Sequence, residues 1–473
     1  MQFYLAGQWQ DRSDTIDVIN PYNKEVIDTV PKASDDDVET ALQSAVSGAE
    51  AMRALSGYER FEILDRAAAM MQEQSEDLAR TLSSEEGKTI NEARGEVDRA
   101  TQTMQLSAEE AKRISGEVLP IDGGKGTEGK FGFTIRVPCG VVAAITPFNF
   151  PLNLVCHKVG PALAGGNSVI LKPASDTPLV ALKLVKILLE AGLPEEGINC
   201  ITGSGSTVGN ALCKDSRVRK ISFTGSQEVG EKICEMAGLK KVTMELGSNS
   251  PLIVMPDADM DLVTQATVRC GYANAGQVCI SAQRIIVHRD MHEQLIDRLQ
   301  SAVPDISAGD QLQEDTDMGP MVRQDDAERV KSWIDEAVSG GARLVCGGDR
   351  DNAIVQPTVL DDTTFEMKVV SDEVFGPTVA VMKAADVDEA IHLANKTKYG
   401  LSAGVFTRNV DVALKFARNV HSGNIHINWG PMWRTDLMPY GGLKDSGLGK
   451  EGPKYAIQEM TESKTVIMHS HES

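Results

Sequence analysis

Residues 140–172, GVVAAITPFNFPLNLVCHKVGPALAGGNSVILK, carry the clearest structural signal in the chain. The run VVAAIT is short, continuous and apolar, which is typical of a strand buried on both faces of a sheet. A helical segment over residues 152–164 follows it, Gly165 and Gly166 end that helix, and SVILK begins a second buried strand. This order predicts two parallel strands joined by a covering helix.

The same alternation continues toward the C-terminus. After a predicted helix over residues 179–190 come strands INCIT, KISFT and KVTMEL, with helical segments between them. A second α/β series begins near Pro251 and runs to about Asn428, after a loop rich in Gly, Ser and Asn. We therefore expect two units with parallel sheets, which bind ligands at the carboxyl ends of their strands.

The N-terminal third is predicted to be helical. Ser34, followed by three aspartates, is a helix cap with acids in the first turn, and two amphipathic helices follow at about 59–82 and 91–114. Five glycines between residues 123 and 132 interrupt this pattern between strand-like segments, which predicts a projecting hairpin or arm. The tail is a glycine-rich loop followed by a final strand, TVIMH.

Composition excludes several classes of protein. The 473 residues include 47 Lys+Arg and 68 Asp+Glu, a net charge of 47 − 68 = −21, so a nucleic-acid partner is not expected. The sequence has no apolar run of about 18 residues and no signal-peptide pattern at its start, so no membrane partner is expected. Its eight cysteines form no CxxC pair and its histidines are scattered, which predicts reduced thiols, a cytoplasmic location and no metal site.

Three loops carry residues suited to nucleophilic chemistry. Cys279 lies in the small-residue turn GQVCIS, where a thiol is accessible to a substrate. Asn149 in TPFNFP is an amide held between aromatic and proline residues, suited to stabilising an oxyanion. Glu245 in MELGSN ends a buried strand, where a carboxylate can activate water. Taken singly, each has a simpler interpretation: a core thiol, a turn asparagine and a strand-end acid.

One turn is suited to binding a pyrophosphate. FTGSQEVG, residues 223–230, is a strand, a Gly-Ser turn and a helix start, where backbone N–H groups and the helix dipole favour an anion. It lacks the spacing GxGxxG. GSGSTVG, residues 203–209, has one residue too many for that spacing, so we interpret it as a loop near a cofactor.

Seven motifs in order resemble those of the aldehyde dehydrogenase superfamily over about residues 5–468. They are TPFNFP, KPAS, FTGS, MELG, GQVCIS, EVFGP and PYGGLKDSGLGKEG. The resemblance implies an α/β aldehyde dehydrogenase fold, with a Rossmann-like cofactor domain, an α/β catalytic domain and a small β oligomerisation arm. It places the cofactor domain at 1–114 and 137–247, the catalytic domain at 248–430, and the arm and tail at 115–136 and 431–473.

The resemblance also assigns roles. Cys279 is expected to be the nucleophile, Glu245 the general base, Asn149 the oxyanion donor, and Glu451 a proton-relay acid. The expected product is a carboxylic acid, formed through a thiohemiacetal and a thioester on Cys279. The residues expected to bind NADP or NAD are Thr146, Pro147, Phe148, Lys172, Ser175, Gly225, Ser226, Glu373 and Phe375. Members restricted to NAD often carry Glu where Ser175 stands, so NADP is expected to be accepted, and NAD as well. Ser248 replaces the family's second glycine after Glu-Leu, which puts one cofactor contact in doubt.

The expected substrate is a small aldehyde with an anionic or hydroxylated tail. The residues expected to contact it are Arg99, His157, Trp433, Arg434 and Tyr440. Two arginines and a histidine can bind a carboxylate, phosphate or sulfonate through charge-assisted hydrogen bonds. In the alternative interpretation Arg99 pairs with a nearby acid such as Glu96, His157 is a satisfied core residue, and Arg434 braces its own loop.

Three other functions remain open from the sequence: a broad-range dehydrogenase of neutral aldehydes, a cofactor-independent cysteine esterase, and a non-catalytic family member. By resemblance, the arm and final strand imply a homodimer or homotetramer.

Overall fold

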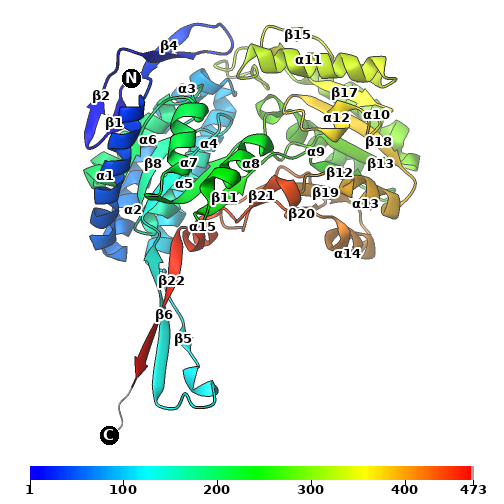
Figure 1. Cartoon of the computed structure of the whole chain (residues 1–473). Helices are drawn as coiled ribbons and strands as arrows, with labels where there is room; N and C mark the ends of the chain where they lie inside the picture. Colours follow the sequence, from blue (N-terminus) through cyan, green and yellow to red (C-terminus); the bar gives the residue numbers. More distant parts are fainter. Residues whose placement is uncertain (470–473) are drawn as a thin grey trace.

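The computed structural model describes residues 1–469, which form two α/β units and a projecting arm (Figure 1). The first unit is built on an eight-stranded sheet with the order β2-β1-β9-β8-β7-β10-β11-β21. Its strands are β1 (Phe3–Leu5), β2 (Gln8–Gln10), β7 (Val141–Ile145), β8 (Ser168–Lys172), β9 (Ile198–Cys200), β10 (Val218–Thr224), β11 (Lys241–Glu245) and β21 (Gly447–Leu448). The five strands β9, β8, β7, β10 and β11 are neighbours in this order and run parallel, which confirms the predicted α/β class.

The strand order of this sheet reverses at β7, because β8 and β9 lie on one side of it and β10 and β11 on the other. Such a reversal opens a crevice at the carboxyl ends of the strands, which is where open α/β sheets bind ligands. The TPFNFP and FTGS motifs follow β7 and β10, so both lie at this crevice.

Helices cover both faces of the first sheet. They are α1 (Asp35–Ala54), α2 (Gly57–Glu73), α3 (Ser75–Glu86), α4 (Ile90–Ala111), α5 (Asn153–Ala164), α6 (Leu179–Glu190), α7 (Asn210–Lys214), α8 (Gln227–Ala237) and α15 (Pro453–Glu459). Every residue of α5 is buried, and α4 and α15 pack against it.

Two predictions for the N-terminal third are wrong. Residues 3–31 are not helical but form β1, β2 and the hairpin of β3 (Thr15–Ile19) and β4 (Val26–Pro31). Tyr4 of β1 pairs with Cys200 of β9, so this strand depends on a partner far along the chain. The helix expected at 59–82 is two helices that meet at Gln74.

The second unit surrounds a seven-stranded sheet with the order β14-β17-β18-β13-β12-β19-β20. Its strands are β12 (Pro251–Val254), β13 (Arg284–His288), β14 (Arg343–Cys346), β17 (Thr358–Asp361), β18 (Thr378–Ala384), β19 (Ser402–Phe406) and β20 (Asn424–Ile427). A separate small hairpin consists of β15 (Arg350–Asp351) and β16 (Ile354–Val355). Its helices are α9 (Met260–Tyr272), α10 (His292–Ala302), α11 (Gln324–Ser339), α12 (Lys368–Ser371), α13 (Val387–Asn395) and α14 (Val410–Asn419).

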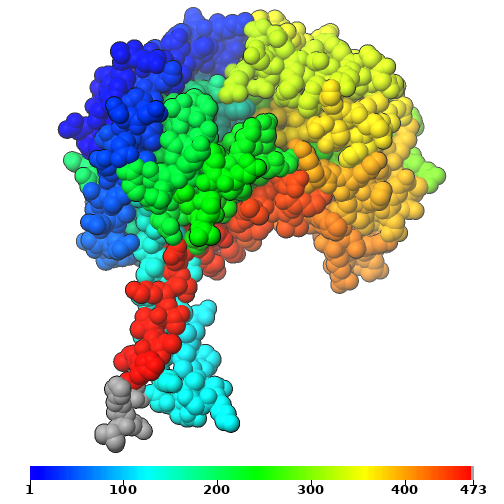
Figure 2. All heavy atoms as spheres, in the orientation of Figure 1, coloured from blue at the N-terminus to red at the C-terminus, as the bar shows by residue number. Residues whose placement is uncertain are grey.

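The arm is a three-stranded antiparallel sheet that stands clear of the two units (Figure 2). It consists of β5 (Val118–Leu119), β6 (Lys130–Pro138) and β22 (Thr461–His469). β22 pairs with β6 along its whole length, from Thr461↔Pro138 to His469↔Lys130. No helix in the described part of the chain has the length and apolar character to cross a membrane.

The C-terminal tail, over residues 431–469, contributes to the first unit as well as to the arm. β21 joins the first sheet, where Gly447 pairs with Glu245, and α15 packs on α5. A Cβ on Gly447 would lie 2.1 Å from the carbonyl oxygen of Met244, so only glycine permits this approach. Among residues 431–469, only β22 belongs to the arm sheet.

Candidate active site

A cavity of about 280 Å³ lies at the carboxyl ends of β7, β10 and β11 and receives side chains from both units. Twelve of the predicted site residues line it: Pro147, Phe148, Asn149, Gly225, Ser226, Glu245, Cys279, Glu373, Phe375, Arg434, Tyr440 and Glu451. The structure therefore brings the three predicted catalytic residues to one space.

Cys279 lies in the loop after α9. Asn274 and Ala275 adopt the left-handed backbone conformation there, with φ of 50° and 52°. Gly276 lies so close to the EVFGP loop that a Cβ on it would be 2.1 Å from the Gly376 carbonyl oxygen. The thiol lies 3.3 Å from the Tyr440 hydroxyl. Burial raises the pKa of Cys279 to about 12, so the thiol is protonated at neutral pH and needs a base to become a nucleophile.

Glu245 is a buried carboxyl group without a partner. It ends β11, is 3% exposed, and neither of its carboxylate oxygens has a hydrogen-bond partner among residues 1–469. Burial, with the negative charge of Glu451, raises the pKa of Glu245 well above its usual value. A free carboxylate beside a thiol can accept a proton from that thiol or from water.

Asn149 contributes an amide to the same space. Its Nδ2 donates to the Gln277 carbonyl oxygen at 2.8 Å, two residues before the thiol. An amide nitrogen carries two hydrogens, so one remains for a substrate oxygen. The backbone carbonyl of Asn149 accepts hydrogen bonds from Lys88 and Asn274.

Glu451 has an environment opposite to that of Glu245. Its two oxygens accept hydrogen bonds from Lys158 at 2.9 Å and from Arg434 at 3.2 Å. Burial alone would raise its pKa, but the cations, Lys158 foremost, lower the pKa of Glu451 to about 2. Lys158 also donates to the Thr224 hydroxyl at 2.7 Å.

The predicted anion-binding residues meet around an acid that we did not predict. Asp436 Oδ1 accepts from Arg99 at 3.0 Å, lies 2.8 Å from His157 Nε2, and is 3.7 Å from Arg434 Nε. Arg99 and His157 therefore both pair with an acid, but with Asp436 and not with Glu96, and their role in binding a substrate stays a prediction. Asp436 lies two residues after Arg434 in the sequence, and this proximity is the signal from which its place at the site could have been predicted.

A second cavity, of about 850 Å³, shares Arg434 with the first. Arg99 and Trp433 also line it, whereas His157 lines neither cavity. Arg269 lies on its wall too and has no ion pair within the described residues; we did not predict it, although it lies on the helix leading to Cys279. No acidic residue is found among the described residues that line this cavity.

The start of α8 is suited to an anion such as a pyrophosphate. Ser226 is the N-cap of α8 but makes no side-chain hydrogen bond to the first turn, and Gly225 and Ser226 line the cavity. Phe148 and Phe375 meet edge-to-face at 5.9 Å, and Glu373 Oε1 accepts from the Ser248 N–H at 2.8 Å.

Three predicted cofactor residues, Thr146, Lys172 and Ser175, are not among those lining the cavity. Lys172 is 5% exposed and donates to the Pro173 carbonyl, and burial lowers its pKa to about 8. Ser248 Oγ lies 3.1 Å from Ser250 Oγ, and Ser248 does not line the cavity, so its side chain leaves that space unchanged.

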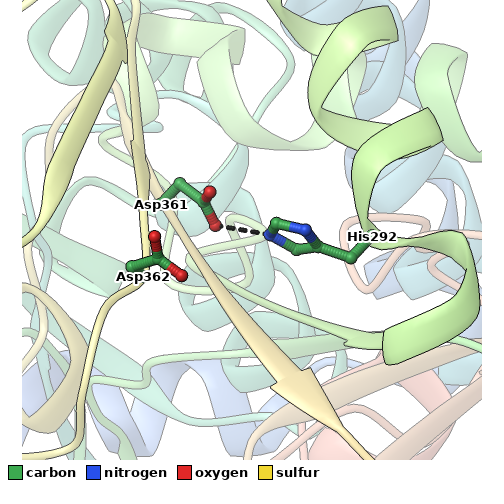
Figure 3. Close-up of side chains that lie close together, drawn as sticks. All are labelled: His292, Asp361 and Asp362. Atoms are coloured by element: carbon green, nitrogen blue, oxygen red, sulfur yellow. Dashed lines mark hydrogen bonds and ion pairs between the residues drawn. The ribbon is translucent and has the colours of Figure 1, made fainter.

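His292, Asp361 and Asp362 form a separate cluster of metal-ligand types in the second unit (Figure 3). His292 Nε2 lies 2.7 Å from Asp361 Oδ1, while Arg343 contacts the other Asp361 oxygen at 2.5 Å. Lys383 donates to Asp362 at 2.8 Å. Because cations already neutralise both carboxylates, this arrangement favours an ionic link between α10, β17 and β18 over a metal centre.

Comparisons with known proteins agree with this geometry. The aldehyde dehydrogenase family model matches residues 9–466. A 3-sulfolactaldehyde dehydrogenase of Priestia aryabhattai is 46% identical over 466 residues, covering 98% of this chain and 97% of that protein. The structure of aldehyde dehydrogenase 21 from Physcomitrella patens, in complex with the reaction product succinate, aligns with a TM-score of 0.97 at 39% identity, covering 100% of this chain and 98% of that one. The glyceraldehyde-3-phosphate dehydrogenase of Methanocaldococcus jannaschii, complexed with NADP, aligns with a TM-score of 0.94 at 39% identity, covering 98% and 100%. The match spans nearly the whole chain in sequence and in structure, and the chain belongs to the aldehyde dehydrogenase family.

Proposed function

We propose that the protein oxidises a small anionic or hydroxylated aldehyde to its carboxylic acid through a covalent intermediate on Cys279. The observation that carries this proposal is the convergence of Cys279, Glu245 and Asn149 on one cavity, with both Glu245 oxygens unpartnered. That set supplies a nucleophile, a base and an oxyanion donor.

The reaction assigns a task to each of these residues and two tasks to Glu245. The Cys279 sulfur, after losing its proton to Glu245, attacks the aldehyde carbon. Asn149 Nδ2 and the Cys279 N–H stabilise the resulting oxyanion; one such donor typically contributes about 2.7–4 kcal/mol. A bound nicotinamide would supply the acceptor for the hydride that the thiohemiacetal on Cys279 loses when it becomes a thioester. Glu245 then removes a proton from water, which attacks the thioester and releases the acid. We assign the proton relay to Glu451, because it lines the same cavity as Glu245 and accepts a hydrogen bond from Lys158.

The hydride acceptor is NADP or NAD. Ser175 carries a hydroxyl where relatives restricted to NAD often carry the carboxylate of Glu, and its Oγ donates to the Gly203 carbonyl at 3.2 Å. No charge at residue 175 then repels a 2′-phosphate, and Lys172 can pair with one. We expect Ser175→Glu to lower kcat/KM with NADP at least ten-fold while leaving NAD nearly unchanged. A wild-type NADP/NAD ratio of kcat/KM far below one would contradict this assignment.

The charge around the second cavity supports a substrate with an anionic tail. Arg99 and Arg434 contact the carboxylate of Asp436, Glu451 is shared between Arg434 and Lys158, and Arg269 adds a third guanidinium, so the cations outnumber these two acids. Burial and the nearby Arg434 lower the pKa of His157, so its ring is neutral at pH 7. Net positive charge therefore remains at this wall in a chain whose total charge is −21, which attracts anions locally. The names of the three related proteins also mention anionic compounds.

The test compares succinic semialdehyde with butanal, which has the same carbon chain without the charge. Reduced cofactor is followed with NAD and with NADP, and Cys279→Ala serves as the blank. Arg99→Gln is expected to raise KM for succinic semialdehyde about ten-fold or more, the equivalent of about 1.4 kcal/mol, and to leave butanal unchanged. Arg113→Gln is the matched control, because Arg113 makes only exposed ion pairs with Glu109 and Glu110.

The alternatives predict other outcomes. Equal effects of Arg99→Gln on both aldehydes would identify a broad-range dehydrogenase. Cys279-dependent ester hydrolysis without any cofactor reduction would identify an esterase, and no Cys279-dependent turnover would identify a non-catalytic member.

We also propose that the protein is a homodimer or homotetramer assembled through its arm and located in the cytoplasm. Val118, Phe131 and Met468 on the arm are 72%, 49% and 58% exposed, which is costly in an isolated chain. The eight cysteines are all free thiols, which agrees with a reducing compartment.

A further inference from the structure

The turn between α3 and α4 buries charged groups beside the active site without lining its cavity. Glu86 is 0% exposed, Lys88 1% and Glu96 3%. Removing an ammonium group from water is costly unless hydrogen bonds and opposite charges replace the water. The contacts of Lys88 therefore indicate which part of the structure this buried charge holds in place.

Lys88 holds the loop that carries Asn149. Its Nζ donates to the Asn149 carbonyl oxygen at 2.7 Å and to Glu96 Oε2 at 2.7 Å, and it lies 3.9 Å from the centre of the Phe150 ring. The other Glu96 oxygen accepts from the N–H groups of Leu152 and Asn153 at 2.9 and 3.0 Å. One buried ion pair thus contacts the oxyanion loop at both ends.

Asn274 connects the same point to the nucleophile loop. Its Nδ2 donates to the Asn149 carbonyl oxygen at 3.1 Å and to Glu86 Oε1 at 2.9 Å. Asn274 precedes Gln277, whose carbonyl accepts from the Asn149 side chain. The Asn149 carbonyl is therefore shared by Lys88 and by the loop that presents Cys279.

We propose that Lys88 is a positioning residue that fixes the Asn149 amide relative to the Cys279 N–H, so that both donors of the oxyanion hole meet one substrate oxygen. This inference rests on the proposed function. Its physical reason is geometric, because oxyanion donors act only at about 2.7–3.1 Å and misplacement by about 1 Å costs on the order of 100-fold in rate.

The test separates two reactions of the same thiol. Acylation of Cys279 by p-nitrophenyl acetate forms a tetrahedral oxyanion and needs the hole. Alkylation by iodoacetamide is a displacement in which the sulfur replaces iodide, and no oxyanion forms. A positioning role lowers the first rate and spares the second, whereas a general structural role lowers both.

The variant is the double substitution Lys88→Met with Glu96→Gln. It removes the donor to Asn149 together with the charge of Glu96, and the amide oxygen introduced at position 96 can still accept from the backbone N–H groups. Glu86 keeps its hydrogen bonds from Asn274 and from the backbone N–H of residue 88. Lys220→Met is the matched control. Lys220 is also fully buried, but its Nζ donates to the Thr243 hydroxyl near the opposite end of β10 and β11.

We expect the double variant to lower ester acylation and kcat for succinic semialdehyde 10- to 100-fold, with alkylation changed less than three-fold. The control should keep all three rates within three-fold. Equal losses of acylation and alkylation, or no loss of acylation, would overturn the positioning role. Failure of the proposed function is distinguishable, since wild type would then reduce no cofactor with any aldehyde.

Discussion

At the scale of single residues, the site depends on two buried glutamates with opposite environments. Glu245 has no hydrogen-bond partner within the described chain, and its pKa is raised, whereas Lys158 and Arg434 contact Glu451 and lower its pKa to about 2. Two carboxyl groups held in different protonation states can divide the work of accepting and relaying protons. This division supports Glu245 as the base in the proposed reaction.

Glu245→Gln is expected to slow thioester hydrolysis about 100-fold or more, because the amide cannot accept a proton from water. In wild type, the hydrolysis rate should increase with pH through the raised pKa of Glu245, since the carboxyl is protonated and inactive as a base below it. Rapid-quench measurement of the acyl-enzyme checks both points.

Glu85→Gln is the control, because Glu85 is fully buried, has a pKa raised to about 8 by burial, and lies outside the cavity lining. If the pH dependence survived in Glu245→Gln and disappeared in Glu85→Gln, Glu245 would not be the base.

At the scale of elements, Arg284 joins β13 to its neighbours. The guanidinium is fully buried and donates to the backbone carbonyls of Asn249, Leu393 and Ala394 at 2.9, 2.9 and 3.0 Å. Two of these carbonyls belong to the last turn of α13, where the helix dipole favours a cation. Arg284, five residues after Cys279, therefore supports the fold.

Arg284→Met is expected to lower the free energy of unfolding by about 3 kcal/mol or more, because it leaves buried carbonyl groups without donors. Urea denaturation measures this difference. Arg408→Met is the control, since the Arg408 side chain is 71% exposed. This substitution should lower the free energy of unfolding by no more than about 0.5 kcal/mol. A similar small loss for Arg284→Met would show that water or other donors satisfy these carbonyls.

At the scale of the whole molecule, the arm is the feature that the single chain does not explain. It extends away from both units (Figures 1 and 2). Several of its apolar side chains are exposed, among them Val118, Phe131 and Met468. Phe131 and Met468 face each other across β6 and β22. An exposed sheet of this kind is suited to pairing with a second copy.

Phe131→Asp combined with Met468→Asp is expected to convert the oligomer to monomers, because it places two like charges in the contact region. Light scattering after size exclusion gives the mass. Leu239→Asp, at a site that is 99% exposed in a loop, should leave the mass unchanged. An unchanged oligomer in the double variant would exclude the arm as the assembly surface.

The sequence alone was enough to predict the parallel α/β architecture and the family. Buried strands such as VVAAIT and helices such as 179–190 follow from local apolar patterns, and the structure has that helix at Leu179–Glu190. Cys279, Glu245 and Asn149 were predictable for the same reason, since their motifs are short and contiguous. Their roles stay predictions until the variants are measured.

Only the tertiary structure decided how distant segments complete the site. Asp436 meets Arg99 across 337 positions of the chain, Lys88 reaches the Asn149 carbonyl across 61, and Tyr4 becomes a strand residue by pairing with Cys200. Local propensity contains no information about such partners, because their energies arise only when the two segments are packed together. Chain pattern therefore determined the elements and motifs, and long-range packing determined the charge balance around the substrate.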